Sequence, residues 1–211
     1  IAVPLPQRLR GEVHLELPAI SSDDYAIDHH GRHRWWPVSP TCRVSVDLLA
    51  PRLSWQGEGY FDSNRGSEPL EAGFSDWDWS RATLADGGSV VQYHSRPLDP
   101  AAPARALALR FDAQGRAQTI APPPAAALPS TAIWRIPRQT GADAPGDTRV
   151  LRTLEDTPFY ARSMLETRLL GETVTAFHES LSLVRFRQRW VQALLPFRMP
   201  RHTRPVRGGP G

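Results

Sequence analysis

The stretch RVSVDLL, residues 43–49, alternates apolar and polar side chains along its length. Successive side chains of a β-strand point to opposite faces, so Val44, Val46 and Leu48 would share one face. The same alternation recurs in five further segments, EVHLELP (12–18), ALALRF (106–111), TAIWRIP (131–137), RVLRTLED (149–156) and TVTAFHESLSL (173–183). This period-two pattern predicts an all-β protein of nine or ten short strands with little helix.

Turn-forming residues separate the alternating segments, at Asp86-Gly87-Gly88, Asp112-Ala113-Gln114-Gly115 and Leu170-Gly171-Glu172. Such residues suit tight hairpins between antiparallel strands. ARSMLETRLL (161–170) could form a helix, but it also alternates, so we predict a strand. APPPAAALPS (121–130) and RQTGADAPGD (138–147) are predicted to be loops. Strands joined by hairpins predict an antiparallel sandwich or barrel.

The composition is typical of a soluble globular chain, with 40% hydrophobic and 22% charged residues among 211. This length is enough to bury a substantial core. No apolar run approaches the ~20 residues that a membrane-spanning helix needs. The single cysteine, Cys42, excludes an internal disulfide and a cysteine-rich metal site. The first residue is Ile1 rather than methionine, which predicts a processed chain or part of a longer protein.

Arginines cluster near the C-terminus in RFRQRWVQALLPFRMPRHTRPVR (185–207), interleaved with Trp190, Leu194, Leu195 and Phe197. The favoured interpretation is a packing segment with a solvated tail, because prolines interrupt the segment. The alternative is a surface that faces anionic lipid. Nucleic-acid binding is not predicted, because the net charge is only +3 and the absence of lysine points to genome composition as the reason for the arginines.

Three histidines lie in DHHGRHRWW (28–36). His29 and His30 are adjacent, so on a strand they would point to opposite faces, and a zinc site usually needs a further ligand cluster elsewhere. We therefore predict no metal site. His33 and Trp35 are two residues apart and would share one face, which favours a single functional histidine.

The stretch GEGYFDSNRGSEPLEAGFSDWDWSRA (57–82) is both acidic and aromatic, which is typical of neither a linker nor a core. Its beginning, in LSWQGEGYFDSN, reads as a strand whose glycines let the backbone bend. Tyr60 and Asp62 would share one face of that strand. The alternative is that Asp62 begins a turn, since Asp62-Ser63-Asn64-Arg65-Gly66 is good turn chemistry. The residues alone leave both possibilities open.

The segment FSDWDWSRA (74–82) alternates too, with two tryptophans on one face and polar residues on the other. The tryptophans are Trp77 and Trp79, and the polar residues are Asp76, Asp78 and Ser80. The favoured interpretation is a half-buried strand with its tryptophans in the core. In the alternative the tryptophans line an apolar ligand cavity, and in a barrel both can hold because the core face is the cavity wall.

Carboxylates also lie beside aromatic residues in LEDTPFYARS (154–163) and FHESLSLVRF (177–186). If buried, these acids need cationic partners, and we expect structural ion pairs. The acids are Glu155, Asp156 and Glu179, and the candidate partners are Arg162 and Arg185. The sequence contains neither a nucleotide-binding glycine loop nor a GxSxG motif.

Three stretches closely resemble the carotenoid 1,2-hydratases of purple phototrophic bacteria, also called hydroxyneurosporene synthases. They are WQGEGYFDSNRGSEPLEAGFSDWDWSRA (55–82), LEDTPFYARS (154–163) and HESLSLVRF…WVQALLPFRMPR (178–201). The likeness runs from AVPLP near the start to PFRMPR near the end. Members of that family are about twice this length, with another β-rich half first, so the chain resembles their C-terminal half.

The resemblance implies a lipocalin-like (calycin) β domain over residues 1–200, and we expect a disordered tail over 201–211. It implies a cofactor-free hydro-lyase that adds water to the terminal C1=C2 double bond of acyclic carotenoids such as neurosporene and lycopene. It further implies a cytoplasmic protein that associates peripherally with the photosynthetic inner membrane. The N-terminal half of the same protein is a further expected partner.

The residues implicated in that family match His33, Trp35, Tyr60 and Asp62. The chemistry suits them, because a carboxyl among aromatics stays protonated near neutral pH and can protonate an alkene. We expect Asp62 to be that acid, and Trp35 and Tyr60 to stabilise the tertiary carbocation at C1. His33 would orient the attacking water or hydrogen-bond Asp62.

Three further tryptophans, Trp55, Trp77 and Trp79, are expected to bind the substrate. The main alternative function is a lipocalin-like domain that holds a carotenoid or other lipid without chemistry. A secreted hydrolase is a third possibility, against which the missing signal peptide and nucleophile argue.

Overall fold

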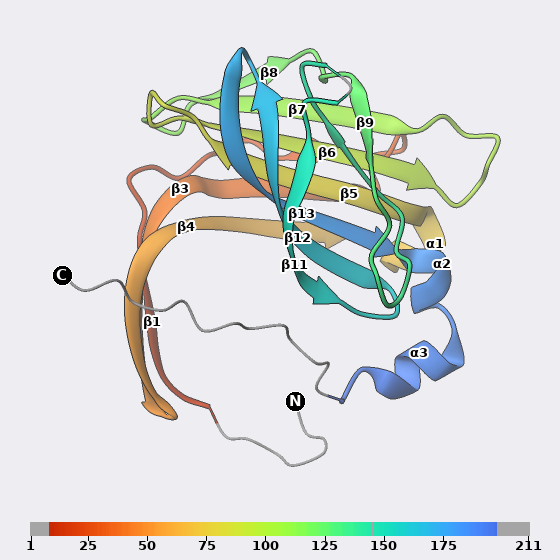
Figure 1. The fold of residues 1–211 in the computed structure, drawn as a ribbon, viewed down its shortest axis with the longest axis horizontal. Coiled ribbons are helices and arrows are strands. Elements are labelled where there is room, and N and C mark those ends of the chain that lie inside the picture. Colours follow the sequence, from red (N-terminus) through yellow and green to blue (C-terminus); the bar gives the residue numbers. More distant parts are fainter. Residues whose placement is uncertain (1–8, 145, 198–211) are drawn as a thin grey trace.

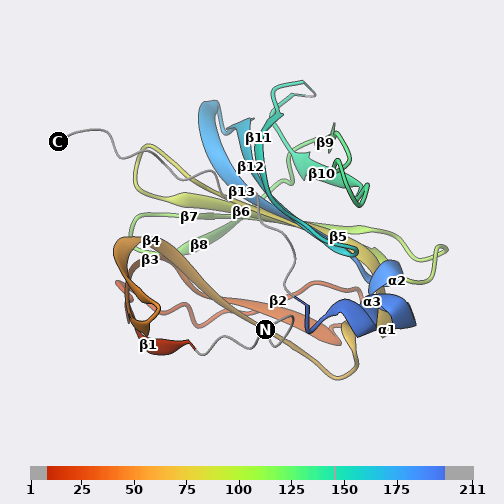
Figure 2. The same cartoon turned by 60° about the horizontal axis from the view of Figure 1, so that its bottom comes forward.

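Two antiparallel β-sheets face each other across an apolar interior (Figures 1 and 2). The computed structural model describes residues 9–144 and 146–197. The strands of the smaller sheet are β1 (Arg10–Glu16), β2 (Tyr25–Ala26), β3 (His33–Ala50) and β4 (Arg52–Gly66). The long strand β3 is central, because β4 pairs along one of its edges while β1 and β2 pair along the other.

The larger sheet has seven strands in the order β11-β12-β13-β5-β6-β7-β8. Consecutive hairpins join β5 to β8 and β11 to β13, and the two groups meet where β13 pairs with β5. The bounds are β5 (Phe74–Thr83), β6 (Ser89–Pro97), β7 (Arg105–Phe111), β8 (Ala117–Ile120), β11 (Arg149–Asp156), β12 (Tyr160–Leu169) and β13 (Glu172–Ser182).

A two-stranded ribbon, β9 (Ala125–Leu128) with β10 (Arg138–Gly141), covers the outer face of the larger sheet (Figure 2). Its Leu128 packs in a second apolar cluster with Ala82 and Leu165 of that sheet. Three short helices gather at one end of the sandwich, α1 (Leu70–Gly73), α2 (Leu183–Phe186) and α3 (Arg189–Leu194). No helix among the described residues is long and apolar enough to cross a membrane.

The main core lies between the two sheets and is rich in aromatic side chains. Alternation places Val91 and Tyr93 of β6, and Leu109 and Phe111 of β7, on the inner face of the larger sheet. The buried members of this cluster are Ile27, Trp35, Phe74, Val91, Tyr93, Leu109, Phe111 and Leu183.

The three predicted turns are confirmed, because each separates two paired strands. Leu170 and Gly171 both have positive φ angles, 53° and 85°, as the turn between β12 and β13 requires. The prediction of a strand for ARSMLETRLL is also confirmed, since these residues form most of β12.

TAIWRIP (131–137) was predicted to be a strand, and this is wrong. Side chains close the segment into a loop instead. Thr131 Oγ1 accepts the backbone N–H of Ile136 at 2.9 Å, and a carboxylate oxygen of Asp156 accepts that of Ile133 at 2.8 Å. Hydrogen bonds of this kind compete with a strand ladder whatever the alternation.

The two predicted loops, APPPAAALPS and RQTGADAPGD, each contain a short strand, so those predictions are wrong in part. The prolines before β9 end at residue 124, which leaves Ala125–Leu128 free to pair with β10. These additions bring the strands in the described residues to thirteen, against the nine or ten expected. The predicted tail, residues 201–211, lies outside the described residues.

Candidate active site

The antiparallel pairing of β3 with β4 brings Trp35, Tyr60 and Asp62 together. Trp35 is aligned with Asn64, which lies two residues beyond Asp62 on the same strand. Because side chains alternate along a strand, Asn64, Asp62 and Tyr60 share one face with Trp35. The prediction of a shared face is therefore confirmed. The alternative in which Asp62 begins a turn is wrong, because β4 continues to Gly66.

These three side chains form a closed set of hydrogen bonds. The indole Nε1–H of Trp35 donates to Asp62 Oδ2 at 2.8 Å and lies 3.0 Å from the Tyr60 hydroxyl oxygen. The Tyr60 hydroxyl in turn donates to the same Oδ2 at 3.0 Å. Both donors converge on one carboxyl oxygen, and Oδ1 accepts no hydrogen bond from the described residues. Oδ1 is therefore the oxygen available to another molecule.

Burial raises the pKa of Asp62 above its ordinary value, while the hydrogen bonds from Trp35 and Tyr60 act in the opposite direction. The like charge of Glu179 adds to the rise. Burial, and then the neighbouring Asp62, raise the pKa of Tyr60 well above its usual range, so its phenol stays neutral and remains a donor. The site thus holds a carboxyl that is more readily protonated than one in water.

Aromatic rings from four strands, β3, β4, β5 and β6, gather around the carboxyl. The ring of Tyr60 lies 5.2 Å from that of Trp79, measured between centroids. Trp35 lies 5.6 Å from Tyr93, which in turn lies 5.9 Å from Trp77. Trp77 and Trp79 pack against the main core, so the favoured interpretation of FSDWDWSRA as a half-buried strand is confirmed.

One buried donor in this cluster has no partner. The indole Nε1 of Trp79 is shielded from solvent and makes no hydrogen bond to any described residue. A buried N–H without an acceptor is costly, and such groups commonly serve a ligand or a water. Because Trp79 contacts Tyr60, an oxygen bound to this N–H would lie close to the Asp62 site.

His33 is buried beside the site, but its ring nitrogens contact groups other than Asp62. Its Nδ1 lies 2.8 Å from a carboxylate oxygen of Asp28, and its Nε2 lies 3.2 Å from the carbonyl oxygen of Glu68. Both ring nitrogens are therefore engaged by groups outside the Asp62 site. Burial opposes the charge on Asp28, but hydrogen bonds from His33 and the Arg32 amide hold its pKa below the ordinary value. His33 therefore fixes the start of β3, and with it Trp35.

Trp55 does not join the other predicted site residues. It lies on β4 at odd spacing from Tyr60 and Asp62, so its side chain leaves the opposite face of the strand, and 47% of its surface is exposed. The structure thus brings together Trp35, Tyr60 and Asp62 with two of the three expected substrate-binding tryptophans.

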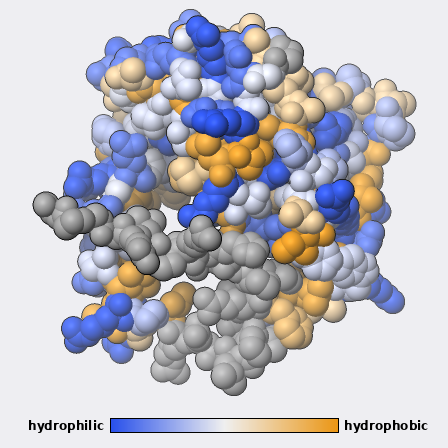
Figure 3. Space-filling view, viewed as in Figure 1, coloured by the Kyte–Doolittle hydropathy of each residue, from blue (hydrophilic) through white to orange (hydrophobic). Residues whose placement is uncertain are grey.

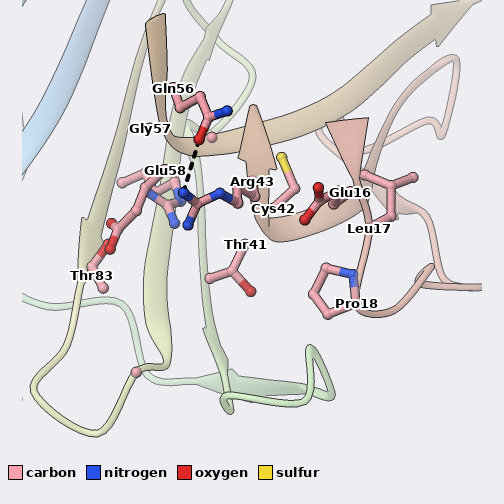
Figure 4. A pocket seen from close by; sticks show the side chains of 13 residues that line it. Glu16, Leu17, Pro18, Thr41, Cys42, Arg43, Gln56, Gly57, Glu58 and Thr83 are labelled. Carbon is pink, nitrogen blue, oxygen red and sulfur yellow. Dashed lines mark hydrogen bonds between the residues drawn. The ribbon is translucent and has the colours of Figure 1, made fainter. Parts of the chain in front are cut away.

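A cavity of about 630 Å³ opens between the sheets next to Tyr60. Residues 56–59 of β4 form one wall, and Arg81 of β5 lies on the other side. Figure 4 shows the polar lining, in which Arg43 donates a hydrogen bond to Gln56 at 3.0 Å. The guanidinium carbon of Arg81 lies 5.7 Å from the Tyr60 ring centroid, so Arg81 contacts both the cavity and the aromatic site.

Sequence reasoning missed two residues of this region, Tyr93 and Arg81. The sequence shows that Tyr93 and Val91 lie on the same face of their strand, because they are two residues apart. It does not show that this face of the larger sheet packs against β3 and β4. Arg81 is buried and donates to the carbonyl of Pro40 at 2.9 Å. Burial lowers its pKa. The expected ion pair of Glu179 with Arg162 is confirmed at 2.7 Å.

The face of β5 opposite the tryptophans carries another carboxyl, Asp78, which is buried. Its predicted separation from the tryptophans is confirmed, because it lies under the β9–β10 ribbon and accepts hydrogen bonds from Ser180 and the Gln139 amide. Burial raises the pKa of Asp78 to about 7. The sheet itself separates Asp78 from Asp62. Within the described residues, no cluster of histidine, cysteine, aspartate and glutamate could hold a metal ion.

Comparison with known proteins identifies the family. Residues 1–206 match the family model described as carotenoid hydratase CrtC. The chain belongs to the carotenoid hydratase CrtC family. The acyclic carotenoid 1,2-hydratase of Thiocapsa roseopersicina is 50% identical over 201 residues, which cover 95% of this chain and 49% of that protein. The one from Rubrivivax gelatinosus is 43% identical over 96% of this chain and 49% of its own length.

This member of the carotenoid hydratase family spans about half the length of those two curated relatives. In Cereibacter sphaeroides the acyclic carotenoid 1,2-hydratase is 36% identical, and the match covers 69% of it. The crystal structure of a putative AttH from Nitrosomonas europaea shares the fold, with a TM-score of 0.50 at 18% identity over 82% of this chain and 59% of that one. The predicted lipocalin-like antiparallel fold is confirmed in its sandwich form.

Proposed function

We propose that this chain carries the acid site of a carotenoid 1,2-hydratase, which adds water across the terminal C1=C2 double bond of an acyclic carotenoid such as neurosporene or lycopene. The similarity to acyclic carotenoid 1,2-hydratases supports the reaction class. The observation that carries the proposal is Asp62, a half-buried carboxyl of raised pKa that lies among aromatic rings and has one oxygen unengaged.

Asp62 acts first, as the proton donor. The π electrons of C1=C2 form the new C2–H bond with the proton on Oδ1, and a tertiary cation remains at C1. The carboxylate left behind is stabilised by the hydrogen bonds from Trp35 and Tyr60 to Oδ2. These bonds strengthen as charge develops, so they favour the transition state over the resting acid.

The aromatic rings then stabilise the cation without reacting with it. Tyr60 and Trp79 lie close together beside the acid, and each aromatic face contributes about 0.5–2 kcal/mol of cation–π attraction. Tyr60 stays neutral because of its raised pKa, so its oxygen is a poor nucleophile toward the cation.

Water completes the reaction at C1. Its oxygen would accept the unpartnered indole N–H of Trp79, and the polar cavity beside Tyr60 is the nearby source of water. The oxygen lone pair forms the C1–O bond, and the surplus proton returns to the Asp62 carboxylate, which restores the acid. His33 contributes by position, since both its ring nitrogens are engaged elsewhere. No step requires a cofactor.

The experiment that tests this function is incubation of the chain with lycopene or neurosporene in detergent, followed by mass spectrometry for the gain of one water. Asp62→Asn should abolish product while circular dichroism shows an intact fold. Asp78→Asn is the matched control, because it changes a buried carboxyl on the opposite face of the larger sheet and should leave turnover largely unchanged. Substantial product from Asp62→Asn would refute the role of the acid.

A second candidate is a carotenoid-binding domain without chemistry. The chain spans only about half the length of two relatives, and this favours a domain that binds the carotenoid but needs the other half for the reaction. Carotenoid bound to the wild-type chain with no hydrated product would support this candidate.

We also propose peripheral association with the cytoplasmic side of the photosynthetic membrane, where the substrate dissolves. Trp190, Leu195 and Phe197 are exposed near α3, next to the exposed arginines Arg187 and Arg189. Figure 3 shows hydrophobic and hydrophilic side chains side by side on the face of the molecule that includes α2 and α3. This combination suits a surface of anionic lipid.

A further inference from the structure

One end of the smaller sheet has its apolar face turned outward. This three-stranded part, which we call the arm, consists of β1, residues 43–50 of β3 and residues 52–58 of β4 (Figure 1). The pairing aligns apolar residues in rows across the strands. Its apolar face comprises Val13, Leu15, Val44, Val46, Leu48, Leu53 and Trp55.

The opposite face of the arm is polar and faces the larger sheet. Alternation along β4 puts Ser54, Gln56 and Glu58 on the same face as Tyr60 and Asp62, and no bulge in β4 interrupts it. Gln56 and Glu58 also line the cavity that Arg81 closes from the other sheet. The apolar face must therefore point away from the body of the sandwich.

This arrangement is the reverse of an ordinary half-buried sheet, in which apolar side chains face the core. The exposed fractions place this surface at the rim of the face, at 61% for Val13, 50% for Leu53 and 47% for Trp55, while Val46 between Val13 and Trp55 is buried at 9%. Contiguous apolar surface of this kind marks an interaction site in a soluble protein. It also accounts for Trp55, which the active site does not use.

The edges of the arm favour a polypeptide over a lipid as the partner. Among the described residues, β1 pairs only with β3, and so does the arm portion of β4. Both edges therefore present open backbone N–H and C=O groups. A partner strand can satisfy such groups, whereas hydrocarbon cannot.

We propose that the apolar face of the arm docks on the remaining half of the longer hydratases, the part of their chain that this sequence does not match. The two relatives from Thiocapsa and Rubrivivax each have about as much chain again beyond the matched region. In such a protein the arm would be buried between the two halves, with a strand of the other half against β1 or β4. The inference does not depend on the chemistry assigned to Asp62.

The test uses this full chain and the separately produced remaining half of the Thiocapsa roseopersicina relative. Light scattering should show a one-to-one complex, and hydrogen exchange should slow in residues 10–16 and 52–57. Leu53→Asp should weaken binding at least tenfold by calorimetry. Ser54→Asp is the matched control, since it places the same charge on the next residue but on the opposite face, and its affinity should stay unchanged.

A second variant, Val13→Asp, guards against a local folding defect. It lies on a different strand and is largely exposed, so it should fold and also weaken binding. An absent complex, or equal affinity for the wild type and both variants, would overturn the proposal. A dimer of this chain alone that Leu53→Asp abolishes would also overturn it, because the occupant would then be a second copy. Binding to anionic vesicles that Leu53→Asp abolishes would overturn it as well, because the occupant would then be a membrane.

Discussion

Tyr60→Phe removes one hydrogen bond at the acid and leaves the aromatic ring in place. In the structure the Tyr60 hydroxyl donates to Asp62 Oδ2 at 3.0 Å, where it stabilises the carboxylate. A hydrogen bond to a charged group is worth about 1.5–3 kcal/mol. Since about 1.4 kcal/mol corresponds to one pKa unit, its loss should raise the pKa of Asp62 by about one to two units.

The sign of the effect on catalysis follows from the role of the acid. Asp62 donates a proton, so activity is present below its pKa and is lost as the pH rises through it. The alkaline limb of the pH profile of kcat/KM should therefore move to higher pH by about one to two units in Tyr60→Phe. The plateau rate should fall, because a weaker acid protonates carbon more slowly.

The assay is lycopene hydration measured by mass spectrometry across pH 5–10 in one detergent. Tyr93→Phe is the matched control, because it deletes the same atom from a ring of the same cluster but makes no hydrogen bond to Asp62. Its alkaline limb should stay in place. An alkaline limb that is unmoved in Tyr60→Phe, or that moves to lower pH, would refute the reasoning about Asp62.

Two further predictions concern buried groups of β5. The pKa of Asp78 is about 7 in the fold against 3.8 in the unfolded chain, so its neutral form is favoured by folding. The free energy of unfolding should fall as pH rises from about 4 to above 7, by up to about 4 kcal/mol, and Asp78→Asn should flatten that dependence in urea titrations. A variant as pH-sensitive as the wild type would contradict this. Trp79→Phe removes the unpartnered N–H, so kcat should fall several-fold while KM changes little; an unchanged kcat would argue against a water held there.

The strands and the aromatic site were accessible to sequence reasoning for the same physical reason. Period-two parity determines which side chains share a face, and this was enough to pair His33 with Trp35 and Tyr60 with Asp62. The same alternation places Trp55 on the opposite face of the strand from Tyr60, so the sequence alone could have excluded Trp55 from the site. TAIWRIP shows the converse failure, because its alternation is real but side-chain hydrogen bonds to the backbone hold it as a loop.

Other features depend on long-range packing that no local pattern encodes. Tyr93 and Arg81 reach the site only because the larger sheet lies across the β3–β4 pair. Asp78 has its raised pKa because the β9–β10 ribbon covers it, and that ribbon comes from segments that read as loops. Equally, the partners of His33 lie on loops 5 and 35 residues away, so its positional role could not be inferred from DHHGRHRWW.

The convergence of two donors on a single oxygen of Asp62 has a stereochemical consequence. With Oδ2 held by Trp35 and Tyr60, the transferable proton is confined to Oδ1, at one edge of the carboxyl group of a side chain fixed in the strand. A carotenoid end group seated in the aromatic enclosure would then receive its proton on one face of C2 only. In heavy water the product would carry deuterium at a single prochiral position of the new methylene group, rather than a mixture of both.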